Sequence, residues 1–214
     1  PDDNNLYLDV VNAKSADGLF DTSSNTASTF ALASGGAAIN ASGSTYVFYA
    51  FAPSQFIALG SYEGTGNAST APFVPTIGST GIPIQPKYIL QKNVDGSFHW
   101  QIYDKARSPN NVIDEGLYAN SSGAEVSGDL NNSLDIVLGG FKPRGTGDPN
   151  RANTSVYLAI GRPMIDTDSR ILTSSPPLAK LFSGTTVATG GVVTLDGDYR
   201  IHTFTSSGTF TVVK

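Results

Sequence analysis

Cysteine is absent from the 214-residue sequence, and charged residues are scarce at 14%. The lack of cysteine excludes thiol catalysis, thiolate zinc sites and disulfide bonds within the chain. Lysine and arginine (13) are outnumbered by acidic residues (18), and the net charge of -5 argues against a nucleic-acid partner, because phosphate binding needs a basic field. No apolar run approaches the roughly 20 residues of a membrane-spanning helix, so membrane insertion is not expected.

The abundant residues are those of short strands and turns. Glycine (23 residues), serine, threonine and asparagine are frequent, whereas strong helix formers are scarce. Small polar residues suit turns, and the β-branched and aromatic residues between them suit pleated strands. The composition therefore predicts an all-β fold. Together with the repeat and the strand patterns described next, it leads us to expect an antiparallel β-sandwich of jelly-roll-like type with a small C-terminal β extension.

Part of the sequence occurs twice. Residues 18–24 (GLFDTSS) resemble residues 116–122 (GLYANSS), and residues 45–52 (TYVFYAFA) resemble residues 154–161 (TSVYLAIG). The blocks come in the same order with similar gaps, and both pairs share aromatic and aliphatic positions. We interpret this as an internal duplication, in which a partial first copy precedes a full second copy.

Several stretches have the pattern of strands. Residues 45–52 are apolar on both faces, which is typical of a strand buried in a two-sheet core. Residues 87–103 predict a hairpin around Asp95-Gly96. Residues 133–144 predict two short strands at a glycine corner, and residues 6–11 are a further strand candidate. Surface loops are expected at residues 62–67 and in the proline-rich segment 69–86.

These patterns predict a division of the chain into domains. Residues 1–163 are expected to form the sandwich, built from the partial first repeat (1–53) and the full second repeat (54–163). Residues 164–182, with paired prolines, are a candidate linker, and residues 183–214 form the β extension. No signal peptide is recognisable and the first residue is Pro1, so we expect a chain that is processed or a piece of a longer protein.

One set of motifs resembles a known family. Their order is Trp-x-x-Tyr-Asp-x-x-Arg, Leu-x-x-Asn-x-x-x-Ala-Glu, Gly-Phe-Lys-x-Arg and Val-Tyr-x-Ala. It resembles a repeat domain in tail-associated structural proteins of tailed bacteriophages, especially those of marine bacteria and cyanobacteria. The terminal residues 202–212 resemble a segment of phage fibre proteins. The resemblance implies a role in virion structure or host attachment. The residues that carry it are Trp100, Tyr103, Asp104, Arg107, Leu117, Asn120, Ala124, Glu125, Gly140, Phe141, Lys142, Arg144, Val156, Tyr157 and Ala159.

Paired carboxylates are the candidate catalytic groups, because two of them can act as acid and base on a glycan. The nearest sets are Asp114-Glu115, Asp166/Asp168 and Asp196/Asp198. A hairpin turn explains the last set better, and an exposed polar loop explains Asp166/Asp168 better than a calcium site does. The motif acids Asp104 and Glu125 are expected to pair with Lys105, Arg107 or Arg144 as structural salt links. No catalytic residue, metal or cofactor is therefore predicted.

Aromatic side chains are the stronger binding candidates, because flat rings bury the C–H surface of sugars at small entropic cost. The candidates are Tyr62, Trp100, Tyr103 and Tyr118. Trp100 has an alternative role as a core anchor of the sandwich, which we favour. Tyr62, next to glycine-rich residues, is the better candidate for an exposed contact.

The sequence thus predicts a non-enzymatic virion protein, a tail-fibre or receptor-binding module that attaches to the host surface as an oligomer. The expected partners are sister subunits in a homotrimer, other virion proteins and a host surface glycan. One alternative is a capsid-decoration or fibre protein with a purely structural role. Another is a glycan depolymerase, which would need a groove with two carboxylates at glycosidase spacing.

Overall fold

The computed structural model describes residues 4–26, 28–33, 39–79, 81–164, 188–189, 191–196, 199–209 and 211–212. The chain divides into two compact units, residues 1–162 and 163–214. Nearly all of the predicted linker, residues 165–182, lies outside the described residues.

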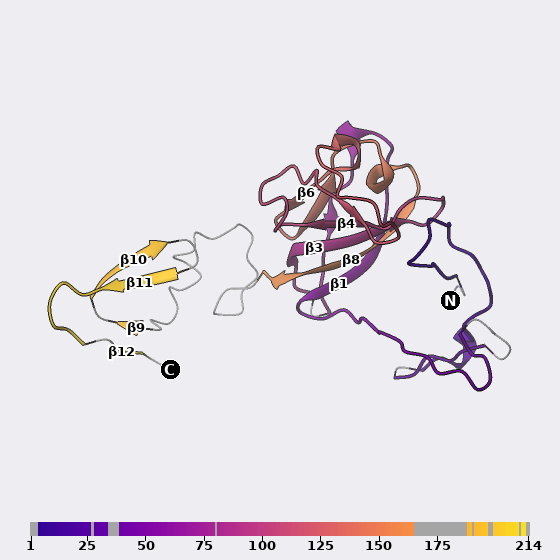
Figure 1. Ribbon diagram of the computed structural model, residues 1–214, viewed down its shortest axis with the longest axis horizontal. Coiled ribbons are helices and arrows are strands. Elements are labelled where there is room, and N and C mark those ends of the chain that lie inside the picture. The colour runs from indigo at the N-terminus through magenta and orange to yellow at the C-terminus, as the bar shows by residue number, and fades with distance from the viewer. Residues whose placement is uncertain are drawn as a thin grey trace. The chain divides into compact units, whose positions relative to one another are not determined.

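The larger unit is a sandwich of two antiparallel sheets (Figure 1). The five-stranded sheet has the order β1-β8-β3-β4-β5, and the three-stranded sheet has the order β2-β7-β6. Regular helix is confined, among the described residues, to four single 3-10 turns, η1 (Thr22–Ser24), η2 (Ala68–Thr70), η3 (Leu130–Asn132) and η4 (Asp148–Asn150). The predicted all-β sandwich is confirmed. The strands are β1 (Ile57–Glu63), β2 (Val74–Pro75), β3 (Ile84–Asn93), β4 (Gln101–Asp104), β5 (Leu117–Tyr118), β6 (Leu134–Val137), β7 (Gly140–Pro143) and β8 (Thr154–Pro163).

Alternation along the strands builds the core. In β8, Ser155, Tyr157 and Ala159 are buried while the residues between them are partly exposed, as expected when one face of a strand meets a second sheet. The buried cluster draws members from both sheets and from the loops between them. It comprises Ala58, Val74, Ile84, Ile89, Tyr103, Ile113, Leu134, Ile136, Phe141, Tyr157 and Ala159.

Three aromatic rings join the two sheets. Phe141 of β7 meets Tyr157 of β8 edge-to-face, with 5.4 Å between ring centroids, and meets Tyr62 of β1 in the same way at 5.6 Å. Gly60 pairs with Tyr157 in the β1–β8 ladder, and a Cβ at residue 60 would lie 2.8 Å from the Tyr157 hydroxyl oxygen. Glycine is therefore needed at residue 60 to leave space for the Tyr157 ring, whose hydroxyl donates to the Pro75 carbonyl oxygen at 2.8 Å.

The two turn predictions in the second repeat are confirmed. Strands β3 and β4 pair antiparallel, with Tyr88 opposite Asp104. Strands β6 and β7 pair across the predicted glycine corner, where Gly139 has a φ of 72°, a value that favours glycine.

The proline-rich segment 69–86 was expected to lie on the surface, and this is wrong. The segment contains β2 and the start of β3, and Ala71, Val74, Thr76 and Ile84 are buried. Pro75 takes a place in β2 because that strand is at the edge of its sheet, where a missing N–H costs no ladder bond.

The described residues of the first repeat contribute no strand to the sandwich, so the prediction that both copies build it is wrong. Residues 45–52, expected to form a buried strand, belong to no strand and are exposed along their whole length. Residues 6–11 also form no strand, and an isolated bridge joins Asn5 to Ser15 beside them. The pattern of residues 45–52 is that of a paired strand, but the described chain supplies no partner strand for it.

The first repeat instead forms an N-terminal arm, residues 4–53 as far as they are described, which starts along the turn between β3 and β4 (Figure 1). The Lys14 amide donates to the Val94 carbonyl oxygen at 2.8 Å, and the Lys14 ammonium pairs with Asp95 at 2.9 Å. The buried Lys92 ammonium donates to the Val11 carbonyl oxygen at 3.2 Å. Backbone and charged contacts thus hold the beginning of the arm on this hairpin.

The described residues of the smaller unit form two short antiparallel ladders. Strand β10 (Val192–Asp196) pairs with β11 (Tyr199–Thr203), and β9 (Ala188–Thr189) pairs with β12 (Thr211–Val212). All four strands lie within the C-terminal β extension expected from the sequence.

We predict that Phe141→Ala lowers the free energy of unfolding of the larger unit by about 3–5 kcal/mol, because it removes a fully buried ring that two other rings contact. The measurement is guanidinium denaturation followed by the fluorescence of Trp100, the single tryptophan. Phe51→Ala, at an exposed residue of the arm, is the matched control and should change the value by less than about 0.5 kcal/mol. Equal effects of the two substitutions would contradict this account of the core.

Candidate functional site

The four aromatic residues expected to bind a ligand do not form one platform. Tyr62 lies in β1, with its ring packed against Phe141 and its hydroxyl donating to the Pro149 carbonyl oxygen at 2.6 Å. Its placement on an exposed loop was therefore wrong: strand β1 extends to Glu63, and its alternation turns Tyr62 inward. Burial raises the pKa of the Tyr62 hydroxyl well above its ordinary value.

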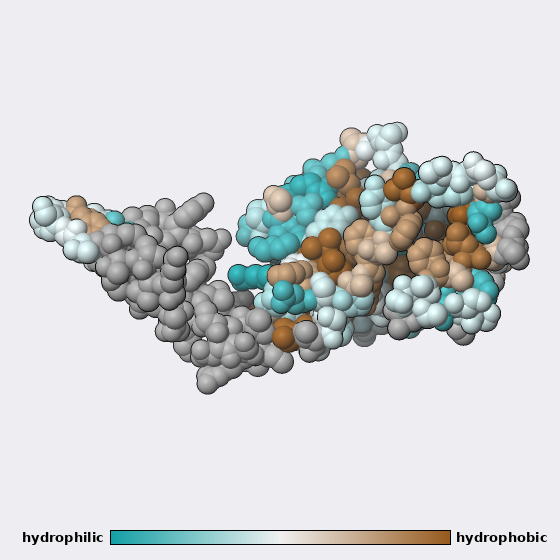
Figure 2. Space-filling view, turned by 90° about the horizontal axis from the view of Figure 1, so that it is seen from below, coloured by the Kyte–Doolittle hydropathy of each residue, from teal (hydrophilic) through white to brown (hydrophobic). Residues whose placement is uncertain are grey.

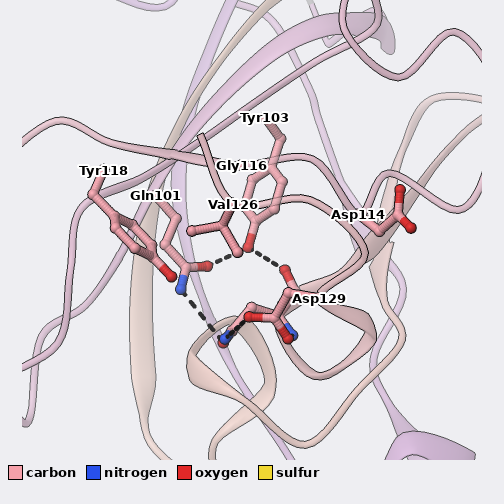
Figure 3. Close-up of a pocket in the computed structure, with 8 residues that line it drawn as sticks. Gln101, Tyr103, Asp114, Gly116, Tyr118, Val126 and Asp129 are labelled. Atoms are coloured by element: carbon pink, nitrogen blue, oxygen red, sulfur yellow. Dashed lines mark hydrogen bonds between the residues drawn. The ribbon is translucent and has the colours of Figure 1, made fainter. Parts of the chain in front are cut away.

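Tyr103 and Tyr118 line one small pocket together with Gln101, Asp114 and Asp129 (Figure 3). Tyr103 is buried, and its hydroxyl donates to the side-chain oxygen of Gln101 and the main-chain oxygen of Asn132. Burial raises the pKa of the Tyr103 hydroxyl well above its ordinary value. Smaller contributions in the same direction come from the nearby Tyr62, Tyr118, Asp148 and Asp129. A buried ring with a bonded hydroxyl serves as a core residue, with no free face for a ligand.

The pocket has room for about one water molecule, at about 10 Å³, and none for a sugar ring. Its acid Asp129 caps η3, accepting from the Asn131 and Asn132 amides at 3.1 and 3.3 Å and from the Asn132 side chain at 2.7 Å. Asp114 lies at the rim and points away from this network (Figure 3). The hydrogen bonds around the pocket thus hold the neighbouring strands and η3 in place.

Tyr118 carries the accessible part of this region. It belongs to β5, the edge strand of the larger sheet, and is half-buried. His99 stacks on it with 4.2 Å between ring centroids and 18° between the ring planes. The Asn120 side chain lies 3.1 Å from His99 Nδ1 and accepts from the Trp100 amide at 2.9 Å, which fixes the loop beside the stacked pair.

Trp100 is neither a core anchor nor a free platform. Its side chain is half-buried, and its indole N–H donates to the Tyr7 carbonyl oxygen of the N-terminal arm at 2.8 Å. The residue therefore joins the arm to the sandwich. It follows His99 in the chain, which places it next to the stacked pair on the approach to β4.

The salt links expected from the motif residues are confirmed. Arg107 pairs with Asp104 at 2.7 Å and with Glu125 at 3.0 Å, so one guanidinium connects the end of β4 to the loop after β5. Arg144 pairs with Asp135 at 3.2 Å between β6 and the end of β7. Burial raises the pKa of Asp104, but hydrogen bonds from Arg107 and Ala106 and the charge of Arg107 outweigh burial and lower the pKa below its ordinary value.

The other candidate acids come to no common site among the described residues. Asp166, Asp168 and Asp198 lie outside the described part of the chain. No cluster of three or more histidine, aspartate or glutamate side chains suited to a metal ion occurs within the described ranges. Nor does that part of the chain contain a helix long and apolar enough to span a membrane.

Sequence reasoning missed two features of the surface. His99, which was not among the sequence-based candidates, stacks on Tyr118. The available signal was its position directly before the motif residue Trp100. The second feature is an exposed aromatic cluster on the arm, where Phe30 meets Phe48 edge-to-face at 5.3 Å and Phe20 at 6.4 Å. Its signal was the apolar pattern of residues 45–52 on both faces.

We predict that the Asp104–Arg107 link makes stability depend on pH. Because the folded pKa of Asp104 lies below its ordinary value of 3.8, the link stabilises the fold above that value and loses its effect as pH falls through the folded pKa. Arg107→Gln should lower the free energy of unfolding by about 1–2 kcal/mol at pH 7, and the difference from the parent should shrink below pH 4.

The measurement is denaturant unfolding at several pH values, followed by Trp100 fluorescence. Lys87→Gln, which removes the same charge from an exposed residue of β3, is the control and should lie within about 0.5 kcal/mol of the parent at each pH. A constant deficit of Arg107→Gln from pH 7 to pH 3 would show that the side chain acts by packing and not through the carboxylate.

Comparison with known proteins places the chain in a family. No curated protein matches it, and no solved structure matches it. The model of one family, described as a domain of unknown function (DUF7483), matches residues 1–161, which span both the N-terminal arm and the sandwich. Since this match covers more than half of the sequence, the chain belongs to the DUF7483 family.

Proposed function

We propose that this protein is a non-enzymatic bacteriophage virion protein, a tail-fibre or receptor-binding module that attaches to the host surface as an oligomer. The observation that carries the proposal is the stacked pair of His99 and Tyr118 at the edge of the larger sheet. The motif order from Trp100 to Ala159, similar to that of tail-associated phage proteins, supports it.

The geometry suits binding of a host surface glycan. A stacked ring pair that neighbouring hydrogen bonds hold in place loses little side-chain entropy when a sugar packs on it. A single contact of this size binds weakly, so attachment draws on several copies of the site, as in a trimeric fibre, where avidity multiplies the affinity. The proposed location is the surface of the virion, with other virion proteins as further partners.

A purely structural role in a capsid or fibre is the second candidate, and the exposed aromatic residues of the arm favour it. In that role sister subunits cover these residues and no external ligand is bound. A depolymerase is the third candidate. Of the acids beside the small pocket at Tyr103, Asp129 is held as the cap of η3, and the space beside it fits about one water molecule, which gives this candidate little support.

We predict that Tyr118→Ala weakens binding to a bacterial surface polysaccharide by about tenfold or more, because it removes one ring of the stack. The measurement is surface plasmon resonance of the purified protein against a panel of immobilised lipopolysaccharides and capsular polysaccharides. Tyr88→Ala, at a half-buried tyrosine of β3, is the matched control and should retain binding.

Three results separate the candidates. A glycan bound by the parent and by Tyr88→Ala, but not by Tyr118→Ala, supports the proposed function. Binding to no member of the panel, together with a monomeric mass by native mass spectrometry, contradicts it. Release of reducing ends from a polysaccharide by the purified protein would replace it with the depolymerase.

A further inference from the structure

Strand β1 has an open side at the margin of the larger sheet (Figure 1). On its other side it pairs with β8: Gly161 donates to the Phe56 carbonyl oxygen at 3.0 Å just before the strand, and Gly64 donates to that of Asn153 at 3.1 Å just after it. Because bonded and unbonded pairs alternate in an antiparallel ladder, the main-chain groups of the odd-numbered residues of β1 point away from β8. These residues are Ile57, Leu59, Ser61 and Glu63. Within the described ranges no strand lies on this side of β1.

Apolar side chains are exposed near this open side. Phe56, just before β1, is exposed, and so are Leu59 within the strand and Ile160, which lies opposite its first residue. Figure 2, seen from below the view of Figure 1, shows apolar residues spread over the larger unit among polar ones. An open strand edge with apolar residues around it is a place where a further strand can pair.

The chain directly before β1 already turns back on itself. The Ser54 amide donates to the Ile57 carbonyl oxygen at 2.9 Å, which is one of the groups that point away from β8. The Ser54 hydroxyl accepts from the amides of Phe56 and Ile57, each at 3.1 Å. Two residues joined across two others form the closing pair of a two-residue hairpin. The segment that leads into this turn is the exposed apolar stretch 45–52 of the arm.

The closing pair fixes the register of a strand that continues from it, because turn geometry determines pairing in a hairpin. With Ser54 opposite Ile57, Ala50 comes opposite Ser61 and Phe51 comes opposite Gly60. Pro53 then falls at a position whose nitrogen points away from β1, where the missing N–H costs no ladder bond. The sequence before the turn is therefore compatible with a strand in this register.

The same register turns the most exposed side chains of the arm inward. Val47 and Tyr49, which are 80% and 85% exposed, come to the face of β1 on which Tyr62 packs against the second sheet. Phe51 covers Gly60, which is exposed, and an aromatic ring beside a strand glycine replaces the packing that the glycine lacks. Phe48 stays on the opposite face, so its contact with another arm residue is not broken.

We propose that residues 47–53 dock on the open side of β1 as the first strand of a hairpin, opposite residues 58–64, and extend the larger sheet to six strands. The occupant of the open side is thus the arm of the same chain, which the turn at Ser54 directs to it. Docking closes the sheet edge at which another chain could otherwise pair. The proposal does not depend on glycan binding.

Docking is reversible, and the arm as the structure shows it is the open state. Ordering the segment costs backbone entropy, which offsets much of the gain from pairing and burial, so the open and docked states have similar free energies. Loss of the docked state then changes the folded population only about twofold. Phe51→Ala therefore remains a control for the sandwich core.

The test is disulfide formation, for which the absence of cysteine from the sequence leaves a clean background. Ala50→Cys and Ser61→Cys are introduced together in the full chain, because directly opposite residues have the spacing that a disulfide needs. The matched control is Ala52→Cys with Glu63→Cys. It has the same separation along the chain but places the two residues four positions out of register, about 13 Å apart in the docked state.

The measurement is the intrachain disulfide at equilibrium in glutathione buffers, determined by mass spectrometry of dilute protein. The effective concentration of the thiols should be about tenfold or more higher for the 50/61 pair than for the 52/63 pair. Adding Tyr49→Asp to the 50/61 pair should remove most of this difference, because it turns a charge toward the second sheet. Denaturation followed by Trp100 fluorescence checks that each variant keeps the sandwich.

Two results overturn the proposal. Equal effective concentrations for the two pairs would show that the arm samples β1 without a register, as a flexible tether does. A disulfide that the 50/61 pair forms only between chains, with a dimeric mass, would show that the arm of a second copy covers β1. Persistence of the full difference with Tyr49→Asp would also contradict the proposed inward face.

Discussion

The contact on which the sandwich depends is the edge-to-face packing of Phe141 against Tyr62 and Tyr157. These rings come from β7, β1 and β8, so one cluster fixes the distance between the sheets and the register of the β1–β8 ladder. Edge-to-face pairs add directional attraction to the burial of area, which makes the arrangement specific as well as stable. Gly60 is part of the same constraint, since any side chain there would meet the Tyr157 ring.

At the C-terminal end of β3 the buried side chains are polar instead of aromatic. Gln91, Lys92 and Asn93 are buried in succession, and the Lys92 ammonium donates to three main-chain oxygens, those of Val11, Asn93 and Gly96. Burial lowers the pKa of Lys92, and the charge of Asp148 opposes that effect. Carbonyl oxygens of both the arm and the hairpin accept from this buried ammonium, so it couples the arm to the hairpin. Removal of the arm would leave a charged donor without one of its acceptors.

The features that the sequence could predict are those that depend on neighbours close in the chain. The β3–β4 hairpin and the corner at Gly139 follow from turn chemistry, and the pairing of Arg107 with Asp104 follows from a separation of three residues. Residues 45–52 were misjudged because alternation and β propensity describe a strand once it is paired, while pairing depends on the other strands present. The same limit applies to Tyr62, whose direction follows from the length of β1 and not from the glycines that come after it.

The register of β1 and β8 also determines how the sandwich responds to a pull along the chain. Ile57, where β1 begins, lies opposite Ile160, near the end of β8, so the chain enters and leaves the sandwich at the same end of the sheet. Tension applied between residues 53 and 163 therefore pulls β1 and β8 apart at this end. The hydrogen bonds of the ladder are then loaded one pair after another. The pairs next to Ile57 and Ile160 are therefore the first to part, unless a further strand covers β1 and shares the load.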